Sequence, residues 1–382
     1  MYDLNAYGRM MADSVRMKAY TTALREAINP HSVVLEIGTG AGIFALLACQ
    51  YGAKRVYAIE PSDVISVARA AAVANGYADR IIFLQDYSTN IMLPERADII
   101  LSDLRGTLPY FHTNVTSLID ARQRFLAPGG RLIPQDDSLQ VGVVSAPELY
   151  RHYTAPWDEH GQKLDWQVAR RAVLNTSHLG RVKPEQILMS AQCGSALDYT
   201  SVVNPNFKGK VSWTAEQAGT AHGLIVWFET TLVEGIRLSG APGNPELVYG
   251  NAFFPWLQPT AIAAGDSVSV TLQADLVGKD YVWRWESSVL DQGKPDQIKA
   301  NFKQSDFFGR LWSPKTLRKM EAGYTPTLNE AGQIQQFILE QMDGTASLDE
   351  IAHQVSIQFP RRIANQQEAL TIVREMSRKF GN

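Results

Sequence analysis

The spacing of hydrophobic and polar positions changes several times along this chain. In residues 1–30 apolar side chains recur near a 3.6-residue period with charges between them, which predicts helix. From residue 33 onward short apolar runs alternate with longer helical stretches. The runs predict strands over 33–37, 56–59, 81–84 and 97–101, and the stretches predict helices over 43–51 and 64–75. Unbroken apolar strands separated by helices indicate an α/β fold with a parallel sheet covered on both faces.

After about residue 135 the pattern becomes rich in strands that bury one face. The stretches with this patterning are 139–143, 224–228, 268–272 and 281–285. Glycine and proline cluster between the strands, as in residues 240–245. We therefore expect residues 136–315 to form an antiparallel β-barrel or sandwich.

Residues 326–382 predict a third, helical unit. Ser347 to Glu350 is a capping box that begins a helix, and Asp343 with Gly344 ends the one before it. The side chains expected to face inward fall into three stripes: Ile334, Phe337, Ile338 and Met342; Ile351, Ala352 and Val355; and Ala369, Val373, Met376 and Phe380.

Composition and charge narrow the class of protein. The length of 382 residues suggests two or three domains, and 45% hydrophobic with 20% charged residues is ordinary for a globular protein. The net charge of -3 gives no basic field for nucleic acid or an anionic membrane. No apolar run approaches the ~20 residues of a membrane span. We expect neither nucleic acid nor membrane as a partner.

The cysteine count and the composition of residues 1–20 favour the cytoplasm as the compartment. Cys49 and Cys193 are the only cysteines, which excludes a disulfide framework and a four-cysteine zinc module and fits a reducing cytoplasm. We expect no metal site. Residues 1–20 carry five charged side chains and no apolar core, so we expect no signal peptide.

The strongest chemical signal is the glycine turn from Glu36 to Gly42, which follows a strand and precedes a helix. Glu60 ends the next strand, where a carboxylate can hold both ribose hydroxyls of an adenosine ligand. Dinucleotide sites favour G-x-G-x-x-G, whereas G-x-G-x-G with an acid two residues before the first glycine is typical of S-adenosylmethionine. The spacing argues against a nicotinamide oxidoreductase. A tight turn without a ligand is the structural alternative.

Further segments resemble the protein arginine methyltransferases, in family order over roughly residues 7–310. Met10 to Arg16 with Tyr20 is similar to the family's N-terminal helix, M-x-x-D-x-x-R. The other matching segments are Ser102 to Gly106, Phe125 to Gly130, Trp157 with Lys183 to Ile187, and Gly223 to Phe228. The resemblance implies four parts: an N-terminal helical segment over the cofactor (1–30), a Rossmann-like class I methyltransferase domain (31–135), a β-barrel domain with a dimerisation-arm-like segment (136–315) and the helical C-terminal unit (326–382).

By this resemblance the cofactor is S-adenosylmethionine and the assembly is a homodimer. Arg16 would pair with the carboxylate of the cofactor's methionine part through a charge-assisted bond. Ser88 and Thr89 replace the family's acid near the adenine, and Asp86 is close enough to substitute for it. The implied cofactor-binding residues are Met10, Arg16, Glu36, Gly38, Gly40, Gly42, Glu60, Asp86 and Ser88.

The substrate half departs from the family. Where the family has two glutamates that clamp a guanidinium, this chain has Asp103 and His112, and Leu247 to Tyr249 replaces the Thr-His-Trp loop. Asp103 and His112 are the candidate catalytic residues, with a helix cap and a bystander loop histidine as the alternatives. Arg105 and Tyr249 are candidate substrate residues. The acceptor is a protein, a peptide or a small molecule, and arginine is possible.

The last unit has its own resemblance. Met342 to Ala352 is similar to the peptide-binding chaperone of pyrroloquinoline quinone biosynthesis, which implies a winged-helix-like unit that takes a peptide as an added strand. Seven acidic against five basic residues in 326–382 disfavour DNA binding. A helical extension packed on the barrel is the plain alternative. For the whole chain, a non-catalytic cofactor-binding or peptide-binding partner with the same fold is the second hypothesis.

Overall fold

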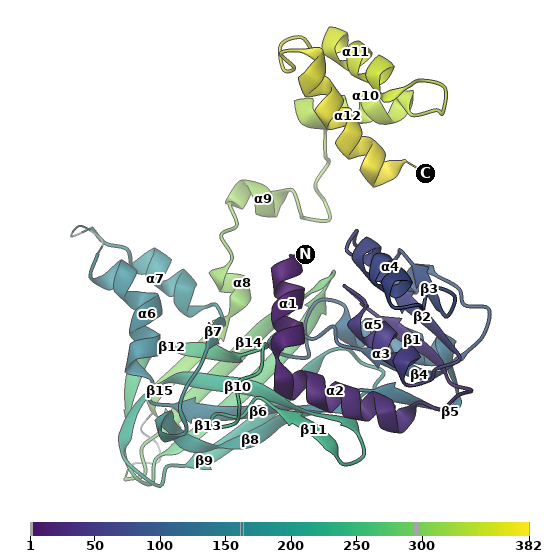
Figure 1. Cartoon of the computed structure of the whole chain (residues 1–382). Helices are drawn as coiled ribbons and strands as arrows, with labels where there is room; N and C mark the ends of the chain where they lie inside the picture. Colours follow the sequence, from purple (N-terminus) through teal and green to yellow (C-terminus); the bar gives the residue numbers. More distant parts are fainter. Residues whose placement is uncertain (1–2, 161, 163, 294–297, 382) are drawn as a thin grey trace. The chain divides into compact units, whose positions relative to one another are not determined.

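The computed structural model describes residues 3–160, 162, 164–293 and 298–381. The chain divides into two compact units, Met1–Leu311 and Trp312–Asn382, and each is described by itself. Figure 1 shows the elements of both units. In the described part of the chain, no helix is long and apolar enough to span a membrane.

A parallel five-stranded sheet forms the first part of the larger unit. Its order is β3-β2-β1-β4-β5, and the central strand β1 is buried at every position. The strands are β1 (Val33–Ile37), β2 (Arg55–Ile59), β3 (Ile81–Leu84), β4 (Ala97–Ser102) and β5 (Leu126–Ile133). Between them lie α3 (Ile43–Gln50), α4 (Ile65–Ala74), η1 (Ser88–Asn90) and α5 (Asn114–Phe125). The predicted Rossmann-like fold is confirmed, and the order changes direction between β1 and β4, where such sheets bind ligands.

The N-terminal lead-in is two helices, α1 (Leu4–Ala12) and α2 (Ser14–Ala27), with Asp13 between them. Asp13 Oδ1 accepts the backbone N–H of Arg16 at 2.9 Å and so caps α2. Its Oδ2 accepts the backbone N–H of Val248 at 2.8 Å. One carboxylate therefore begins the helix and fixes it to the β-domain.

Two antiparallel sheets follow, with orders β7-β12-β10-β6-β8 and β15-β14-β13-β9; β11 pairs with β10. Trp256 and Trp285 are fully buried between them. The predicted antiparallel β-domain is confirmed, and closure into a barrel stays a prediction. The strands are β6 (Asp136–Val144), β7 (His178–Gly180), β8 (Ile187–Asp198), β9 (Phe207–Thr214), β10 (Gly219–Val233), β11 (Ile236–Ser239), β12 (Asn251–Ile262), β13 (Ser267–Val277), β14 (Asp280–Leu290) and β15 (Ile298–Ser305).

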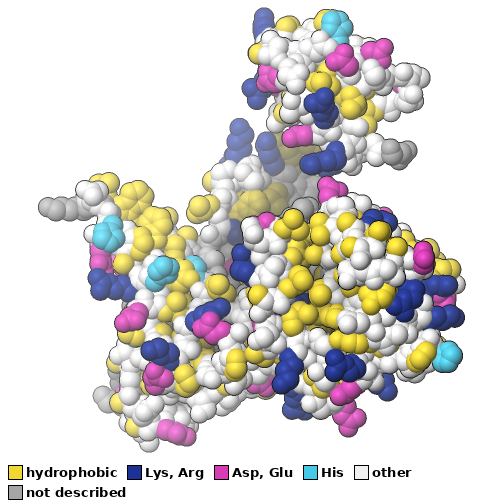
Figure 2. Space-filling view, in the orientation of Figure 1, with side chains coloured by type: hydrophobic (Ala, Val, Ile, Leu, Met, Phe, Trp, Pro, Cys, Tyr) yellow, Lys and Arg dark blue, Asp and Glu magenta, His cyan; other side chains and the backbone are white. Residues whose placement is uncertain are grey.

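A helical hairpin of α6 (Pro147–Asp158) and α7 (Gln167–Leu174) interrupts the β-domain. Its apolar side chains Leu164, Trp166 and Val168 are exposed. Figure 2 shows hydrophobic side chains gathered on this hairpin. Trp157 lies on α6, whereas Lys183 lies outside the hairpin and caps the short helix η2 (Pro184–Gln186) before β8. The larger unit ends after α8 (Asp306–Gly309).

The smaller unit consists of α9 (Pro314–Arg318), α10 (Glu330–Gln341), α11 (Leu348–Gln358) and α12 (Gln366–Phe380). Ser347 and Glu350 make both hydrogen bonds of the predicted capping box. Nine buried residues form its core, but Phe380 is 50% exposed, which corrects its inward assignment. Phe380 is the last residue of α12 and is not part of this core. Residues 312–381 contain no strand, so this unit lacks the sheet edge that strand addition requires.

Candidate active site

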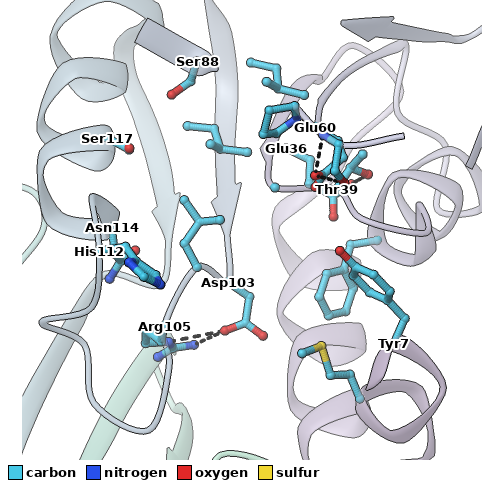
Figure 3. A pocket seen from close by; sticks show the side chains of 18 of the residues that line it. Tyr7, Glu36, Thr39, Glu60, Ser88, Asp103, Arg105, His112, Asn114 and Ser117 are labelled. Carbon is cyan, nitrogen blue, oxygen red and sulfur yellow. Dashed lines mark hydrogen bonds and ion pairs between the residues drawn. The ribbon is translucent and has the colours of Figure 1, made fainter. Parts of the chain in front are cut away.

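A cavity of about 580 Å³ lies at the carboxyl ends of the parallel strands, beside the point where the strand order changes direction. Side chains from α1, α2, α5 and the loop of residues 103–113 close it, together with Tyr249 of the β-domain. Figure 3 shows Glu36 and Glu60 on one wall and His112 and Asn114 on the opposite one. The cavity therefore joins the glycine turn to the predicted substrate residues.

The glycine turn is held tightly between β1 and α3. Gly38 has a φ of +77°, and a side chain there would come within 2.3 Å of Leu104. The N–H groups of Gly38 and Thr39 both donate to the Ile59 carbonyl at 2.9 Å, which fixes the turn against β2. Gly38 lines the cavity, whereas Gly40 and Gly42 are not among its lining residues.

The glycine at position 42 has a packing role instead. Gly42 caps α3 with a φ of +89°, and an added Cβ would lie 2.7 Å from the Cβ of Ala68 on α4. Gly40 likewise leaves room for the ring of Tyr7. Both glycines therefore let α1 and α4 approach the turn, and their contacts with the cofactor stay a prediction.

Glu60 follows β2 and lines the cavity with 8% of its surface exposed. Its Oε2 accepts the N–H of Gly40 at 3.1 Å, and its Oε1 accepts the N–H and the hydroxyl of Ser62 at 3.0 and 2.6 Å. These donors orient the carboxylate beside the glycine turn. This is the position from which a carboxylate can accept the hydroxyls of a ribose.

Glu36, near the end of β1, is 3% exposed and accepts the Thr39 hydroxyl at 2.6 Å. Burial raises its pKa to about 8, although the Thr39 hydrogen bond opposes the shift. At neutral pH this side chain therefore carries a proton in much of the population, and it can donate a hydrogen bond as well as accept one.

The end of the cavity near β3 contains Asp86 and Ser88. Asp86 accepts the N–H of Tyr87 at 2.7 Å and the amide of Asn90 at 2.8 Å, so it also shapes its own loop. Ser88 is buried in η1, and Ser117 of α5 lies on the same side of the cavity, opposite Glu36 and Glu60 (Figure 3). Ser117 was missed in the sequence analysis, since nothing in its helical surroundings marks it.

Asp103 lies directly after β4 and binds three side chains that line the same cavity. Its Oδ2 accepts Nε and Nη2 of Arg16 at 2.9 and 2.7 Å and the Tyr249 hydroxyl at 2.6 Å. Its Oδ1 accepts Nη2 of Arg105 at 3.2 Å. Met10, another predicted cofactor residue, accepts Nη1 of Arg16 at 3.1 Å through its carbonyl. Three of the four residues predicted for the acceptor half therefore lie together with Arg16, and His112 is the exception.

The charges in this network hold Asp103 ionised. Burial alone would raise the pKa of Asp103, but the guanidinium groups of Arg16 and Arg105 outweigh burial and lower it. Burial together with the Asp103 charge raises the pKa of Tyr249 well above its usual range, so its hydroxyl stays a donor. Because both oxygens of Asp103 are engaged and its pKa is low, this geometry does not suit it as a proton acceptor.

Arg105 is turned toward the β-domain. It is 4% exposed, its Nη1 donates to Asp137 of β6 at 2.7 Å, and its Nη2 donates to the Tyr20 hydroxyl. Tyr199 donates to the second oxygen of Asp137. The predicted substrate role of Arg105 therefore competes with an internal ion-pair network. Asp137 and Tyr199 have no local sequence signal, since only the tertiary fold brings them here.

His112 lines the cavity on the loop before α5, apart from the Asp103 network. Its φ of +44° is unusual for a residue with a side chain. Its Nδ1 is hydrogen bonded to Oδ1 of Asp280, the first residue of β14. Asp280 was also missed in the sequence analysis, because it lies 168 residues away.

Three features define a class of protein: the Rossmann-like sheet, the glycine turn and a carboxylate after β2. They fit an adenosine ligand, since Glu60 borders the turn, and the cavity continues to the buried Arg16, which can pair with an anionic group of the ligand. A family model described as "Methyltransferase domain" matches residues 10–175. This part of the chain is therefore similar to methyltransferase domains.

The chain also resembles the protein arginine methyltransferases in sequence and in fold. It is 26% identical over 245 residues to "Probable protein arginine N-methyltransferase 6" of Arabidopsis thaliana, covering 61% of this chain and 55% of the relative. It is 28% identical over 305 residues to human "Protein arginine N-methyltransferase 2", covering 75% and 69%. The chain thus spans between half and about two thirds of the length of these relatives.

The fold likeness extends further along the chain. A Trypanosoma brucei structure, the PRMT1 enzyme-prozyme heterotetrameric complex with AdoHcy, superposes with a TM-score of 0.70 at 22% identity. The match covers 78% of this chain and 96% of that one. It therefore includes the β-domain as well as the methyltransferase domain.

Proposed function

We propose that this chain transfers a methyl group from S-adenosylmethionine to a protein, peptide or small-molecule acceptor. One observation carries the proposal. The cavity that begins at the glycine turn and Glu60 continues to the side chains that follow β4, so a donor and an acceptor can meet in one cavity. The methyltransferase domain matched over residues 10–175 supports the same reaction class.

In this proposal one half of the cavity binds the cofactor and the other half aligns the acceptor. S-adenosylmethionine supplies an electrophilic methyl carbon on a sulfonium. Glu60 accepts the ribose hydroxyls, and Arg16 shares its guanidinium between Asp103 and the cofactor's carboxylate. Methyl transfer is an in-line displacement, so most of the catalytic help comes from alignment of the acceptor by the cavity walls.

A second copy of the chain completes the proposed assembly. The exposed apolar side chains of the α6–α7 hairpin require a partner surface, and a groove over α3 and α4 offers one. The residues of that groove include Met11, Ile43, Leu46, Leu47, Val67 and Ala71. A monomeric mass in solution would contradict the homodimer.

Both cysteines are free thiols, which supports the expected cytoplasmic compartment.

The engaged state of Asp103 favours one competing function, a cofactor-binding partner without turnover. Labelled S-adenosylmethionine incubated with the chain and an extract of the source organism separates the two. Label in protein, peptide or small molecules supports methyl transfer. Bound cofactor with no label in any fraction would support the competing function.

A further inference from the structure

We infer that the methyl acceptor is an electrically neutral group, that His112 takes its proton, and that Asp280 positions His112 for this step. The inference rests on the proposed methyl transfer and specifies its substrate class. It is carried by the charges of the acceptor half of the cavity and by the contacts that hold the His112–Asp280 pair.

The carboxylates that line the cavity are unequally placed. Glu36, Glu60 and Asp86 lie at the ends of β1, β2 and β3, on the side of the glycine turn. Among the carboxylates of the described lining residues, only Asp103 lies after β4, and its oxygens already accept two arginines and a tyrosine. Asp103 therefore has no free oxygen for a cation, and Asp280, the carboxylate next to His112, is not among the residues that line the cavity.

A guanidinium or ammonium acceptor would meet unfavourable electrostatics there. It would face Arg16 and Arg105, both buried, whose charges are already balanced by Asp103 and Asp137, and it would find no unpaired carboxylate beside them. Removing a charge from water without a partner costs several kcal/mol, of the order found for buried unpaired ions. A neutral acceptor avoids this cost, but it must release a proton when it is methylated.

His112 can take that proton. Its Nδ1 hydrogen bond to the Asp280 carboxylate requires that Nδ1 be the protonated nitrogen, which leaves the lone pair of a neutral imidazole on Nε2. Figure 3 shows the imidazole directed into the cavity, on the wall opposite Glu36 and Glu60. Within the described residues, no hydrogen bond to Nε2 of His112 is found.

Packing brings the two elements of the pair together, while the side chains of His112 and Asp280 are themselves more than half exposed. Tyr110, two residues before His112, stacks on Phe207 and contacts Tyr281 and Trp283 edge-on. Tyr281 directly follows Asp280 on β14. The Tyr110 hydroxyl is also 3.0 Å from the Ser195 hydroxyl.

The loop of residues 103–113 is therefore fixed at both ends, by the Asp103 network and by these rings. His112 keeps its unusual φ of +44° within this frame. A residue held in that conformation beside a cavity is a candidate for a functional role.

The proposed step balances as follows. The lone pair of the acceptor atom forms the bond to the methyl carbon while the sulfur–carbon bond breaks, and that bond's electron pair stays on sulfur as a neutral thioether. The acceptor's proton passes to Nε2 of His112. The resulting imidazolium is stabilised beside the Asp280 carboxylate until the proton is released to water.

The methylated atom is the first test. Labelled products from the extract are digested, and the labelled group is identified by mass spectrometry. We expect methyl groups on atoms that are neutral at the assay pH, such as hydroxyl oxygens or imidazole nitrogens. Methylarginine or methyllysine as the main product would overturn the inference and leave the proposed function standing. Failure of S-adenosylhomocysteine to bind would instead refute the proposed function itself.

The His112 variant supplies a readout that a purely structural role would not change. Glycine accepts the φ of +44°, so His112→Gly should fold, lose about 100-fold in kcat and keep its affinity for S-adenosylhomocysteine. Added free imidazole should restore much of the lost rate. Unchanged turnover, or a loss that imidazole does not restore, would overturn the proton-transfer role.

Asp280 is tested against a matched aspartate on the neighbouring strand. Asp280→Asn should lower kcat about tenfold without changing KM, and Asp280→Glu should retain part of the rate. Asp275→Asn, which removes an ion pair with Arg284 on the same sheet, is the control and should leave turnover unchanged. Equal effects of the two asparagine variants would show that Asp280 has no positioning role.

Discussion

The two halves of the cavity use carboxylates in opposite ways. Glu60 accepts two backbone N–H groups and one hydroxyl, all uncharged donors, and it faces the cavity. Asp103 accepts hydrogen bonds from two guanidinium groups and a phenol, so its charge is balanced by groups of the protein itself. In this cavity the charge of Glu60 is left for a ligand because its protein partners are neutral, whereas the charge of Asp103 is balanced by the two arginines.

The largest expected effect is on stability and comes from Asp103. Asp103→Asn leaves the buried Arg16 and Arg105 short of a counter-charge, which should cost about 3–5 kcal/mol of unfolding free energy. Because the pKa of Asp103 is lowered in the folded chain, its stabilisation is present at neutral pH and lost as pH falls through that lowered pKa.

Urea unfolding at pH 7 measures the effect of this substitution. Glu159→Gln is the control, because it breaks an exposed ion pair with Arg151 and should cost less than about 1 kcal/mol. If both variants lose the same stability, the account of a saturated, charge-balanced network is wrong.

The next effect is on affinity and comes from Glu60. Glu60→Gln should weaken S-adenosylhomocysteine binding about 10- to 100-fold, since it replaces charge-assisted bonds to the ribose by neutral ones. Isothermal calorimetry measures the change, and thermal unfolding checks that stability is kept. Glu234→Gln, an exposed position between β10 and β11, serves as the control and should bind as the parent chain does. Unaltered affinity in Glu60→Gln would remove Glu60 from the cofactor site.

A smaller effect follows the protonation of Glu36. Its folded-state pKa of about 8 exceeds the ordinary 4.5, so between these values the folded chain holds a proton that the unfolded chain releases. The unfolding free energy contributed by this group therefore falls as pH rises from 4.5 to 8. Glu36→Gln should remove this decrease of the unfolding free energy with pH. We expect the thermal midpoint of the variant, relative to that of the parent chain, to be higher at pH 8 than at pH 5. An equal difference at the two pH values would contradict the raised pKa of Glu36.

The smallest effect is expected at Ser62, which only orients Glu60. Ser62→Ala removes the 2.6 Å hydrogen bond to the carboxylate but keeps the backbone one. We expect a loss of about 1 kcal/mol in S-adenosylhomocysteine affinity by calorimetry. A loss as large as that of Glu60→Gln would mean that the serine itself contacts the ligand.

The two halves also differ in how far the sequence predicts them. The glycine turn, β1 and Glu60 lie within 28 consecutive residues (33–60), so local spacing suffices to predict their arrangement. The acceptor half joins Arg16, Asp103, Asp137 and Tyr249, which are far apart along the chain. Their identities could be proposed by resemblance, but the saturation of Asp103 by two arginines is a property of the tertiary fold.

Three smaller differences between the sequence prediction and the structure also arise from tertiary contacts. Helical periodicity predicts the lead-in, but the break at Asp13 depends on a hydrogen bond to Val248, 235 residues away. Phe380 fits the stripe of its helix, yet burial depends on the tertiary core, of which Phe380 is not part. Asp280 has no motif around it, and only the packing of Tyr110 against β14 brings it to His112.

Calorimetric titration of the full chain with S-adenosylhomocysteine and, separately, with NAD tests the central claim most directly. The cavity has the G-x-G-x-G turn and Glu60 of an adenosine site without phosphate contacts. We predict binding of S-adenosylhomocysteine, weakened by Glu60→Gln, and no binding of NAD. Binding of NAD without binding of S-adenosylhomocysteine would contradict the account.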